Sequence, residues 1–191
     1  MKRWKTTLVA VLVFAAILAY VLLVERNKEP PARPEVMPSP TPVTLLDIAP
    51  GDVRAVQATD GTDTLRLTRE GEDGAWQVAE GQGYGQRSPA NEISVSLAVE
   101  ELAHLEARVV VLDAVSDLAT YGLAPPALEL TLERTDGSEA RLAAGREAPD
   151  GTAFYVQLAG DPRLYLVDHY RIEPFLRWIS TPPYAPTPAS E

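Results

Sequence analysis

The longest apolar segment of the chain lies near its N-terminus. Residues 6–24 contain no charged side chain, and three basic residues precede them within residues 1–5. As a helix that rises about 1.5 Å per residue, the segment spans roughly 28 Å, close to the thickness of a hydrocarbon core. We therefore expect a transmembrane anchor over residues 6–24. The basic start predicts a cytoplasmic N-terminus.

A cleaved signal peptide is the competing interpretation of this segment. The apolar part of a signal peptide is about 7–15 residues long and ends at small residues. Here the segment closes on Tyr20 and four aliphatic residues, with no small-x-small triplet before Glu25. This pattern favours an uncleaved single-pass anchor in the plasma membrane, with the following chain outside the cytoplasm.

Two proline-rich stretches bound the rest of the chain. Residues 25–43 contain six prolines, which disfavour helix and sheet ladders and favour an extended spacer, so we expect a stalk here. Residues 181–191 contain four prolines, and we expect a short, loose tail after the last helix. Residues 44–180 are then the expected folded unit, a length typical of one domain.

Within this unit, apolar and polar positions alternate in two successive series. In the first series, alternation predicts strands over 53–58, 64–68 and 75–78. The dipeptide Asp60-Gly61 predicts a hairpin between the first two strands.

A helix is expected next, with Ser88 as its N-cap and Pro89 in its first turn. Ile93 and Leu97 lie on the side opposite to its main apolar stripe, so we expect other elements on both sides of the helix. The stripe consists of Val95, Ala98, Val99, Leu102 and Leu105.

The second series repeats the first. Alternation predicts strands over 128–132, 139–143, 153–158 and 163–168, followed by a helix. The apolar face of this helix consists of Ile172, Phe175, Leu176 and Ile179. Two rounds of strands followed by a helix, without a required crossover, predict an α+β domain with antiparallel strands.

The acidic net charge of the chain limits the kinds of molecule that the domain can bind. The net charge is −10, and residues 1–28 carry five basic residues and one acid, so the chain that follows them carries −14. An acidic domain repels phosphate backbones and anionic headgroups, so we expect no nucleic-acid partner and no adhesion to lipid beyond the anchor. The chain has no cysteine, so no disulfide supports the domain.

Several motifs could in principle carry chemistry. The stretch 81–85 superficially resembles a dinucleotide-binding loop, but its third glycine comes one residue early and the strand before it alternates. The acidic stretches 60–63 and 70–74 do not have the spacing of a calcium loop. His104 and His169 have no matching nucleophile motif. We therefore expect no catalytic, cofactor-binding or metal-binding residue, and no cofactor.

An aromatic cluster in the second series has two interpretations. It can pack in the core between the last strands and the last helix, or it can form a platform for a small ligand or glycan. Its members are Phe154, Tyr155, Tyr165, Tyr170, Phe175 and Trp178. The core interpretation is preferred because such mixed aromatic sets more often pack internally.

A series of short motifs resembles a bacterial extracytoplasmic domain-of-unknown-function family, number 4340, over roughly residues 45–178. The motifs are Trp76-Gln77-Val78, Pro89 with Leu97 and Leu102, Tyr121-Gly122-Leu123 with Pro125-Pro126, Leu128–Leu132, Asp136-Gly137, Leu142 with Gly145, Phe154-Tyr155-Val156 and Tyr165-Leu166-Val167. Members of this family occur alone or with auxiliary subunits of gliding-motility-type ABC transporters. The resemblance implies no catalytic residues.

Together these features predict a membrane-anchored extracytoplasmic protein. We expect a non-enzymatic interaction module of an envelope or ABC-transporter complex, with a small-ligand or glycan binder as the alternative. The interaction surface does not follow from the sequence.

Overall fold

The computed structural model describes residues 41–70, 74–82 and 87–186. The predicted anchor, residues 6–24, and most of the predicted stalk lie outside these ranges. Within them, neither helix has the length and apolar character needed to cross a bilayer. The chain divides into two units, residues 1–39 and 40–191, and all described residues belong to the second.

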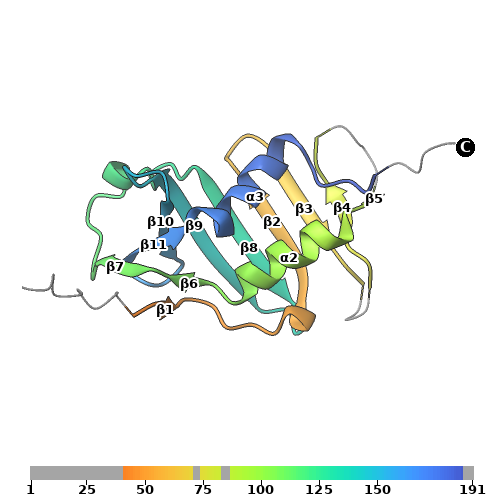
Figure 1. Cartoon of the computed structure of the whole chain (residues 1–191), viewed down its shortest axis with the longest axis horizontal. Helices are drawn as coiled ribbons and strands as arrows, with labels where there is room; N and C mark the ends of the chain where they lie inside the picture. Colours follow the sequence, from red (N-terminus) through yellow and green to blue (C-terminus); the bar gives the residue numbers. More distant parts are fainter. Residues whose placement is uncertain (1–40, 71–73, 83–86, 187–191) are drawn as a thin grey trace, which may run out of the picture. The chain divides into compact units, whose positions relative to one another are not determined.

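The second unit is built on a nine-stranded sheet in which every neighbouring pair is antiparallel (Figure 1). Its order is β5-β4-β3-β2-β8-β9-β10-β11-β7, and β1 pairs with β6 in a separate two-stranded sheet. The strands are β1 (Val43–Thr44), β2 (Val53–Thr59), β3 (Thr64–Thr68), β4 (Gln77–Glu80), β5 (Ser88–Pro89), β6 (Glu106–Ala107), β7 (Val109–Leu112), β8 (Leu128–Arg134), β9 (Glu139–Glu147), β10 (Ala153–Leu158) and β11 (Leu164–Asp168).

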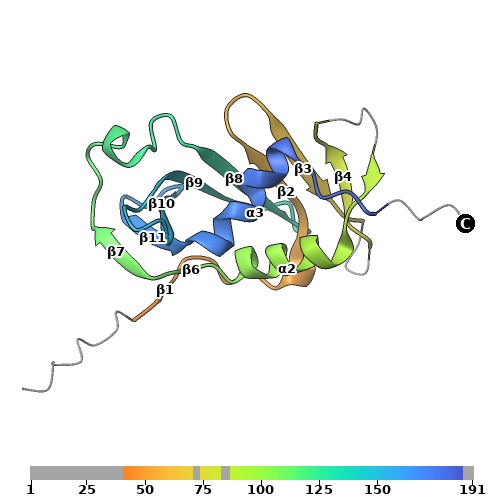
Figure 2. The ribbon, with the colours of Figure 1, turned by 45° about the horizontal axis from the view of Figure 1, so that its top comes forward.

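Two α-helices, α2 (Glu92–Ala103) and α3 (His169–Ser180), cover one face of this sheet (Figures 1 and 2). They contact each other, and α3 also contacts β2, β3, β10 and β11. Two short 3-10 helices, η1 (Pro50–Asp52) and η2 (Ala119–Tyr121), precede β2 and β8. The predicted α+β class with antiparallel strands is confirmed.

The core lies between the helices and the covered face of the sheet. Alternate residues of the central strands are fully buried there, because successive side chains of a strand point to opposite faces. The residues on this face include Val56, Ala58, Leu65, Leu67, Leu130, Leu132, Leu142 and Val156. The alternation of apolar and polar residues in the sequence therefore identified the face of the sheet that the helices cover.

The strands and helices follow each other in two similar series. The series β1-η1-β2-β3-β4-β5-α2 is followed by β6 and then by β7-η2-β8-β9-β10-β11-α3, and the two helices have 12 residues each. The strands β1, β5, β6 and β7 were not predicted. The central strands β2 and β8 pair antiparallel, and β3 and β9 lie on either side of them. Equivalent residues follow at a nearly constant offset: Asp60-Gly61 and Asp136-Gly137, Leu65 and Leu142, Trp76 and Phe154, Val78 and Val156.

The turns at Asp60-Gly61 and Asp136-Gly137 are formed by the same local chemistry. The Asp60 carboxylate accepts hydrogen bonds from the backbone N–H groups of Thr62 and Asp63, both at 2.9 Å. The Asp136 carboxylate accepts one from the backbone N–H of Ser138 at 2.8 Å. Gly61 and Gly137 have φ values of 88° and 84°, which glycine adopts without a Cβ penalty.

The predicted start of the first helix is wrong. Ser88 and Pro89 form the edge strand β5, and α2 begins at Glu92 with Asn91 as its N-cap. The Asn91 side chain accepts a hydrogen bond from the Ser94 backbone N–H at 3.2 Å. Proline lacks the N–H that an inner strand needs, so the edge of the sheet is a site that tolerates it.

We expected a loose tail after residue 180, but the first residues of this segment are held by hydrogen bonds. The backbone N–H of Asn91 donates to the Pro183 carbonyl at 2.7 Å, and the backbone N–H of Ala185 donates to the Pro89 carbonyl at 2.9 Å. The Tyr184 hydroxyl donates to the Gln82 carbonyl at 3.1 Å. This segment therefore covers the β5 edge, and the folded unit extends past the predicted boundary at residue 180.

Candidate functional site

The large apolar side chains that remain exposed gather on the two helices. Among the described residues these are Ile93, Leu97 and Tyr170, with 75%, 59% and 55% of their surface exposed. Ile93 and Leu97 belong to α2, and Tyr170 lies in the first turn of α3. The expectation that other elements cover both sides of α2 is therefore wrong, because the side with Ile93 and Leu97 faces solvent.

A groove of about 210 Å³ lies between α2 and α3. Ala98 and Trp178 are buried and form its floor, whereas Leu97 and Tyr170 are exposed at its sides. The other lining residues are Ser94, Glu101, Pro174 and Arg177. We call Ile93, Leu97, Tyr170 and Pro174, together with this groove, the helix face.

The helix face is built from equivalent positions of the two repeats. Ile93 and Tyr170 are the second residues of their helices, and Leu97 and Pro174 are the sixth. The positions that point into the core are equivalent as well: Val95 and Ile172, Ala98 and Phe175, Leu102 and Ile179. Apolar residues therefore recur at the same outward positions of both helices.

The two helices differ in charge. α2 carries Glu92, Glu100 and Glu101 and no basic residue, whereas α3 carries Arg171 and Arg177 with one acid, Glu173. Within α3, Arg177 already pairs with Glu173, with 3.4 Å between Nη1 and the carboxylate oxygen.

Arg171 joins the two helices. Its Nη1 lies 3.2 Å from the Glu101 carboxylate and also donates to the carbonyl oxygens of Glu101 and His104, at 3.1 and 2.9 Å. Because these carbonyls lie at the end of α2, the guanidinium satisfies acceptors that the helix leaves free. This contact holds the first turn of α3, and with it Tyr170, against α2.

The opposite face of the sheet is polar. Arg54 and Arg66 both pair with Glu133, at 3.2 and 2.7 Å, and Arg66 also donates to Gln57 at 3.0 Å. Burial alone would raise the pKa of Glu133, but the hydrogen bonds from the two arginines lower it below its usual range. A hollow of about 400 Å³ beside them is lined by Arg54, Arg66, Arg69, Arg87 and Glu70, among others. Here the guanidinium groups already bond to carboxylates and backbone carbonyls of this chain.

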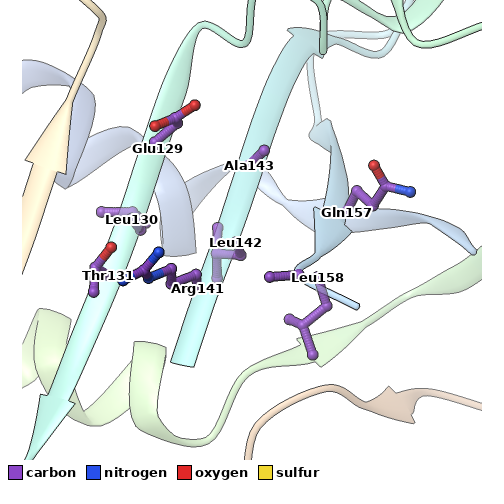
Figure 3. Close-up of a pocket in the computed structure, with 9 residues that line it drawn as sticks. Glu129, Leu130, Thr131, Arg141, Leu142, Ala143, Gln157 and Leu158 are labelled. Carbon is purple, nitrogen blue, oxygen red and sulfur yellow. The ribbon is translucent and has the colours of Figure 1, made fainter. Parts of the chain in front are cut away.

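A second hollow on this face, of about 300 Å³, lies over β8, β9 and β10 (Figure 3). Its polar side chains, Glu129, Thr131, Arg141 and Gln157, are distributed over three neighbouring strands. They do not form a cluster of groups around one point, so this hollow shows no arrangement suited to a specific reaction.

The two histidines lie beside different carboxylates. His104 Nδ1 is 3.1 Å from an Asp47 carboxylate oxygen, and His169 Nε2 is 3.3 Å from a Glu147 carboxylate oxygen. Asp168, the sequence neighbour of His169, instead pairs with Arg108. In the described part of the chain, no group of three or more acidic or histidine side chains is placed to hold a metal ion.

The remaining sequence motifs are mainly structural. The stretch 81–85 falls partly outside the described residues, and the strand β5 separates it from α2, so it does not lead directly into a helix N-terminus.

Of the aromatic cluster, Phe154, Tyr165, Phe175 and Trp178 are buried in the core. Tyr155 contacts Tyr121 edge to face, with ring centroids 5.0 Å apart. The preferred core interpretation is therefore confirmed for four members of the cluster, and Tyr170 is the member that is more than half exposed.

One carboxylate near the end of the sheet makes stability depend on pH. Asp161 accepts hydrogen bonds from Arg163 and from the Tyr165 hydroxyl at 2.7 Å, and these hold the pKa of Asp161 well below its usual range. Burial, followed by the bond to Asp161, raises the pKa of Tyr165 to about 12.

We expect the free energy of unfolding to fall as the pH is lowered from about 5 towards 2, because a depressed pKa stabilises the fold only while the carboxylate is ionised. Urea unfolding at pH 7 and at pH 3 measures this difference, and Asp161→Asn should reduce it. Tyr165→Phe removes one of the same hydrogen bonds and should reduce it in part. An undiminished difference in Asp161→Asn would contradict this account.

Of the comparisons with known proteins, the one with protein families gives a match. Residues 76–189 match a family described as "Domain of unknown function (DUF4340)". No curated protein and no solved structure matches the chain. The match starts at Trp76, later than the expected start near residue 45, and includes both helices and the whole second repeat. Because the match covers more than half of the sequence, the chain belongs to the DUF4340 family.

Proposed function

We propose that this protein is a membrane-anchored, non-enzymatic interaction module that docks onto a protein partner through the helix face. Residues 6–24 would anchor it, residues 25–43 would hold the domain away from the bilayer, and the domain would act outside the cytoplasm. The partner would belong to an envelope complex. An ABC transporter with auxiliary subunits is the class of complex that the family resemblance suggests.

The observation that carries this proposal is the gathering of exposed apolar side chains. Ile93, Leu97 and Tyr170 are the large apolar residues that the described chain leaves exposed. Leu97 and Tyr170 line one groove, and Ile93 lies one turn before Leu97 on α2. Burying one such side chain stabilises a complex by about 1.5–3 kcal/mol. A grouped apolar surface, unlike scattered single residues, is typical of an interaction site.

The charge of the domain supports a protein partner over other macromolecules. The net charge of −14 after residue 28 disfavours nucleic acid and anionic lipid. The helix face itself combines apolar side chains with both signs of charge, at Glu101 and Arg177. Apolar centres with a charged rim are typical of protein–protein interfaces.

The proposed anchor and stalk would strengthen a weak contact. A tether confines the domain near a partner in the same membrane, and this raises the effective concentration without any new contact. A small docking surface is therefore sufficient for a protein held in this way.

The proposal is tested by the accessibility of the helix face in intact cells. The chain has no cysteine, so a single introduced thiol is a unique reporter. We expect a membrane-impermeant maleimide to label Leu97→Cys about tenfold more slowly than Arg141→Cys, which corresponds to about 1.4 kcal/mol of protection. Arg141 is a suitable control because its side chain is 64% exposed on the opposite face of the sheet.

Two further measurements show whether the protection comes from docking and on which side of the membrane the domain lies. Adding Tyr170→Asp to Leu97→Cys places a charge in the helix face and should restore fast labelling. Labelling of Arg141→Cys in intact cells requires that the domain lies outside the cytoplasm. Equal, fast labelling at both positions would contradict docking through the helix face.

A further inference from the structure

We infer that the outer edge of β7 is a second interaction surface, to which a short, extended segment of a partner protein adds as a further strand. The segment is apolar and carries a basic residue at the end that lies beside Asp113. This surface is separate from the helix face, because it belongs to a strand and not to α2 or α3. The inference goes beyond the proposed function and does not depend on it.

The other edges of the sheet are covered by segments of the chain itself. On one side, the segment around Tyr184 covers β5, which also contains Pro89. On the other side, β6 and β7 follow each other with only Arg108 between them, and both lie beside β11. β1 pairs with β6 and does not reach β7. Among the described elements, none therefore lies beyond the outer edge of β7 (Figures 1 and 2).

The backbone of β7 is available for pairing on this outer side. Apart from the ladder with β11, residues Val109–Leu112 make no backbone hydrogen bond to another described residue. Proteins usually protect such an edge with proline or charged side chains, and β7 consists of three valines and a leucine. Because unpaired N–H and C=O groups in a row match those of another strand, the occupant is an extended segment. β7 has four residues, so the added strand is short and the contact is weak.

The residues that precede β1 do not continue along this edge. If the register of β1 with β6 continued, Thr41 would lie opposite Val109. Thr41 and Pro42 are instead exposed and belong to no strand. The cover that β1 provides therefore stops at Ala107.

A second copy of the chain does not fit the edge. Two β7 strands paired antiparallel about a two-fold axis would place residues 106–107 of one copy opposite residues 113–116 of the other. β1 covers the outer side of residues 106–107 and would collide there, because the Val115 N–H donates to the Pro162 carbonyl at 2.9 Å and keeps this stretch in line with β7. The occupant is therefore a segment that ends or turns away before it reaches β1.

The surroundings of the edge indicate the chemistry of this segment. Val110 packs against the core and its neighbours in β7 are aliphatic, so apolar side chains on the added strand find apolar cross-strand neighbours. Arg108, at one end, already pairs with Asp168. Asp113, at the other end, is exposed and has no hydrogen bond or ion pair with another described residue.

The direction of the added strand follows from the sheet. Every neighbouring pair in it is antiparallel, including β7 with β11. A segment added in the same way has its N-terminal end beside Asp113. A lysine or arginine at this end would pair with the Asp113 carboxylate.

Peptide binding to the full chain in detergent micelles tests this surface. The probe is the peptide Lys-Val-Thr-Val-Thr with blocked ends, at several millimolar. We expect the outer backbone amides of residues 109–112 to exchange rapidly in the free chain and several-fold more slowly with the peptide, and those of β4 to stay unchanged. A peptide with two adjacent prolines in its middle lacks one N–H on each side and should have no effect.

A charge swap tests the predicted direction. The parent chain should bind the lysine peptide about threefold more tightly than the same peptide with glutamate in place of lysine, as for an exposed ion pair. Asp113→Lys should reverse this preference. Glu129→Lys, at an exposed acid on β8, is the matched control for net charge and should keep the preference of the parent chain.

Several results would contradict this surface. Slow exchange of every amide of residues 109–112 without peptide would show that the chain itself covers the edge. No effect of the lysine peptide, or an equal effect of the proline peptide, would overturn strand addition. A preference for lysine that survives Asp113→Lys would overturn the predicted direction and the basic end. None of these measurements involves Leu97 or Tyr170, so their failure leaves docking through the helix face standing.

Discussion

Replacing Trp76 with alanine is expected to lower the free energy of unfolding by about 3–5 kcal/mol, a large part of the total for one domain. The Trp76 side chain is only 2% exposed, as the alternation in the sequence predicted. The Arg69 guanidinium lies over its ring, 5.1 Å from the ring centroid. Truncation would leave a cavity and remove this cation–π contact.

The backbone of Trp76 also ties the sheet to the start of α2. Its N–H donates to the Glu92 carboxylate at 2.8 Å, and its carbonyl accepts from the Ala90 N–H at 3.0 Å. Loosening this segment should therefore weaken the helix as well as the core.

Urea unfolding followed by circular dichroism measures the effect of Trp76→Ala. Tyr170→Ala, which truncates an exposed aromatic residue, is the matched control and should change stability by less than about 0.5 kcal/mol. An unchanged melting temperature in Trp76→Ala would contradict the buried role of this ring.

The second large effect is expected at Gly145, near the C-terminal end of β9. A Cβ on Gly145 would lie 2.1 Å from the Tyr121 carbonyl oxygen and 3.0 Å from the Gly122 carbonyl carbon. Both contacts are with backbone atoms, which cannot rotate away as a side chain can. Gly145→Ala should therefore push η2 off the sheet, disrupt the contact between Tyr121 and Tyr155, and cost about 3 kcal/mol.

Gly137→Ala separates this steric effect from the general cost of replacing glycine. Nothing lies within 4 Å of a Cβ at Gly137, and its φ of 84° alone makes the substitution costly, by roughly 1–2 kcal/mol. Urea unfolding should rank Gly145→Ala as the more destabilising. Hydrogen exchange should show faster exchange around Tyr121 in Gly145→Ala only. Equal stability of the two variants would show that η2 yields easily.

Local chemistry explains the parts of the fold that could be predicted. The turns at Asp60-Gly61 and Asp136-Gly137 depend on groups within three residues of each other, so their sequence is sufficient. Alternation identified β2, β3 and β8 because one face of each strand is buried and the other is wet.

Elements that depend on distant partners were missed or misplaced. Ser88-Pro89 has the local pattern of a helix start, but its pairing with β4 makes it a strand. β7 pairs with β11, far away in the sequence, and its four apolar residues do not alternate. The proline-rich segment around Tyr184 is held by contacts with β5 and Gln82, which no local pattern indicates.

The sequence by itself determined the α+β class, the repeated order of strands and helices, the family and most of the buried positions, because these follow from periodicity and short turn motifs. Only the tertiary structure decided which apolar residues stay exposed. Ile93 and Leu97 are as apolar as the core residues of α2, and Tyr170 is as aromatic as the buried Tyr165. Whether such a side chain is covered depends on how two helices from separate repeats pack on one sheet, and that packing is set by contacts between residues far apart in the chain.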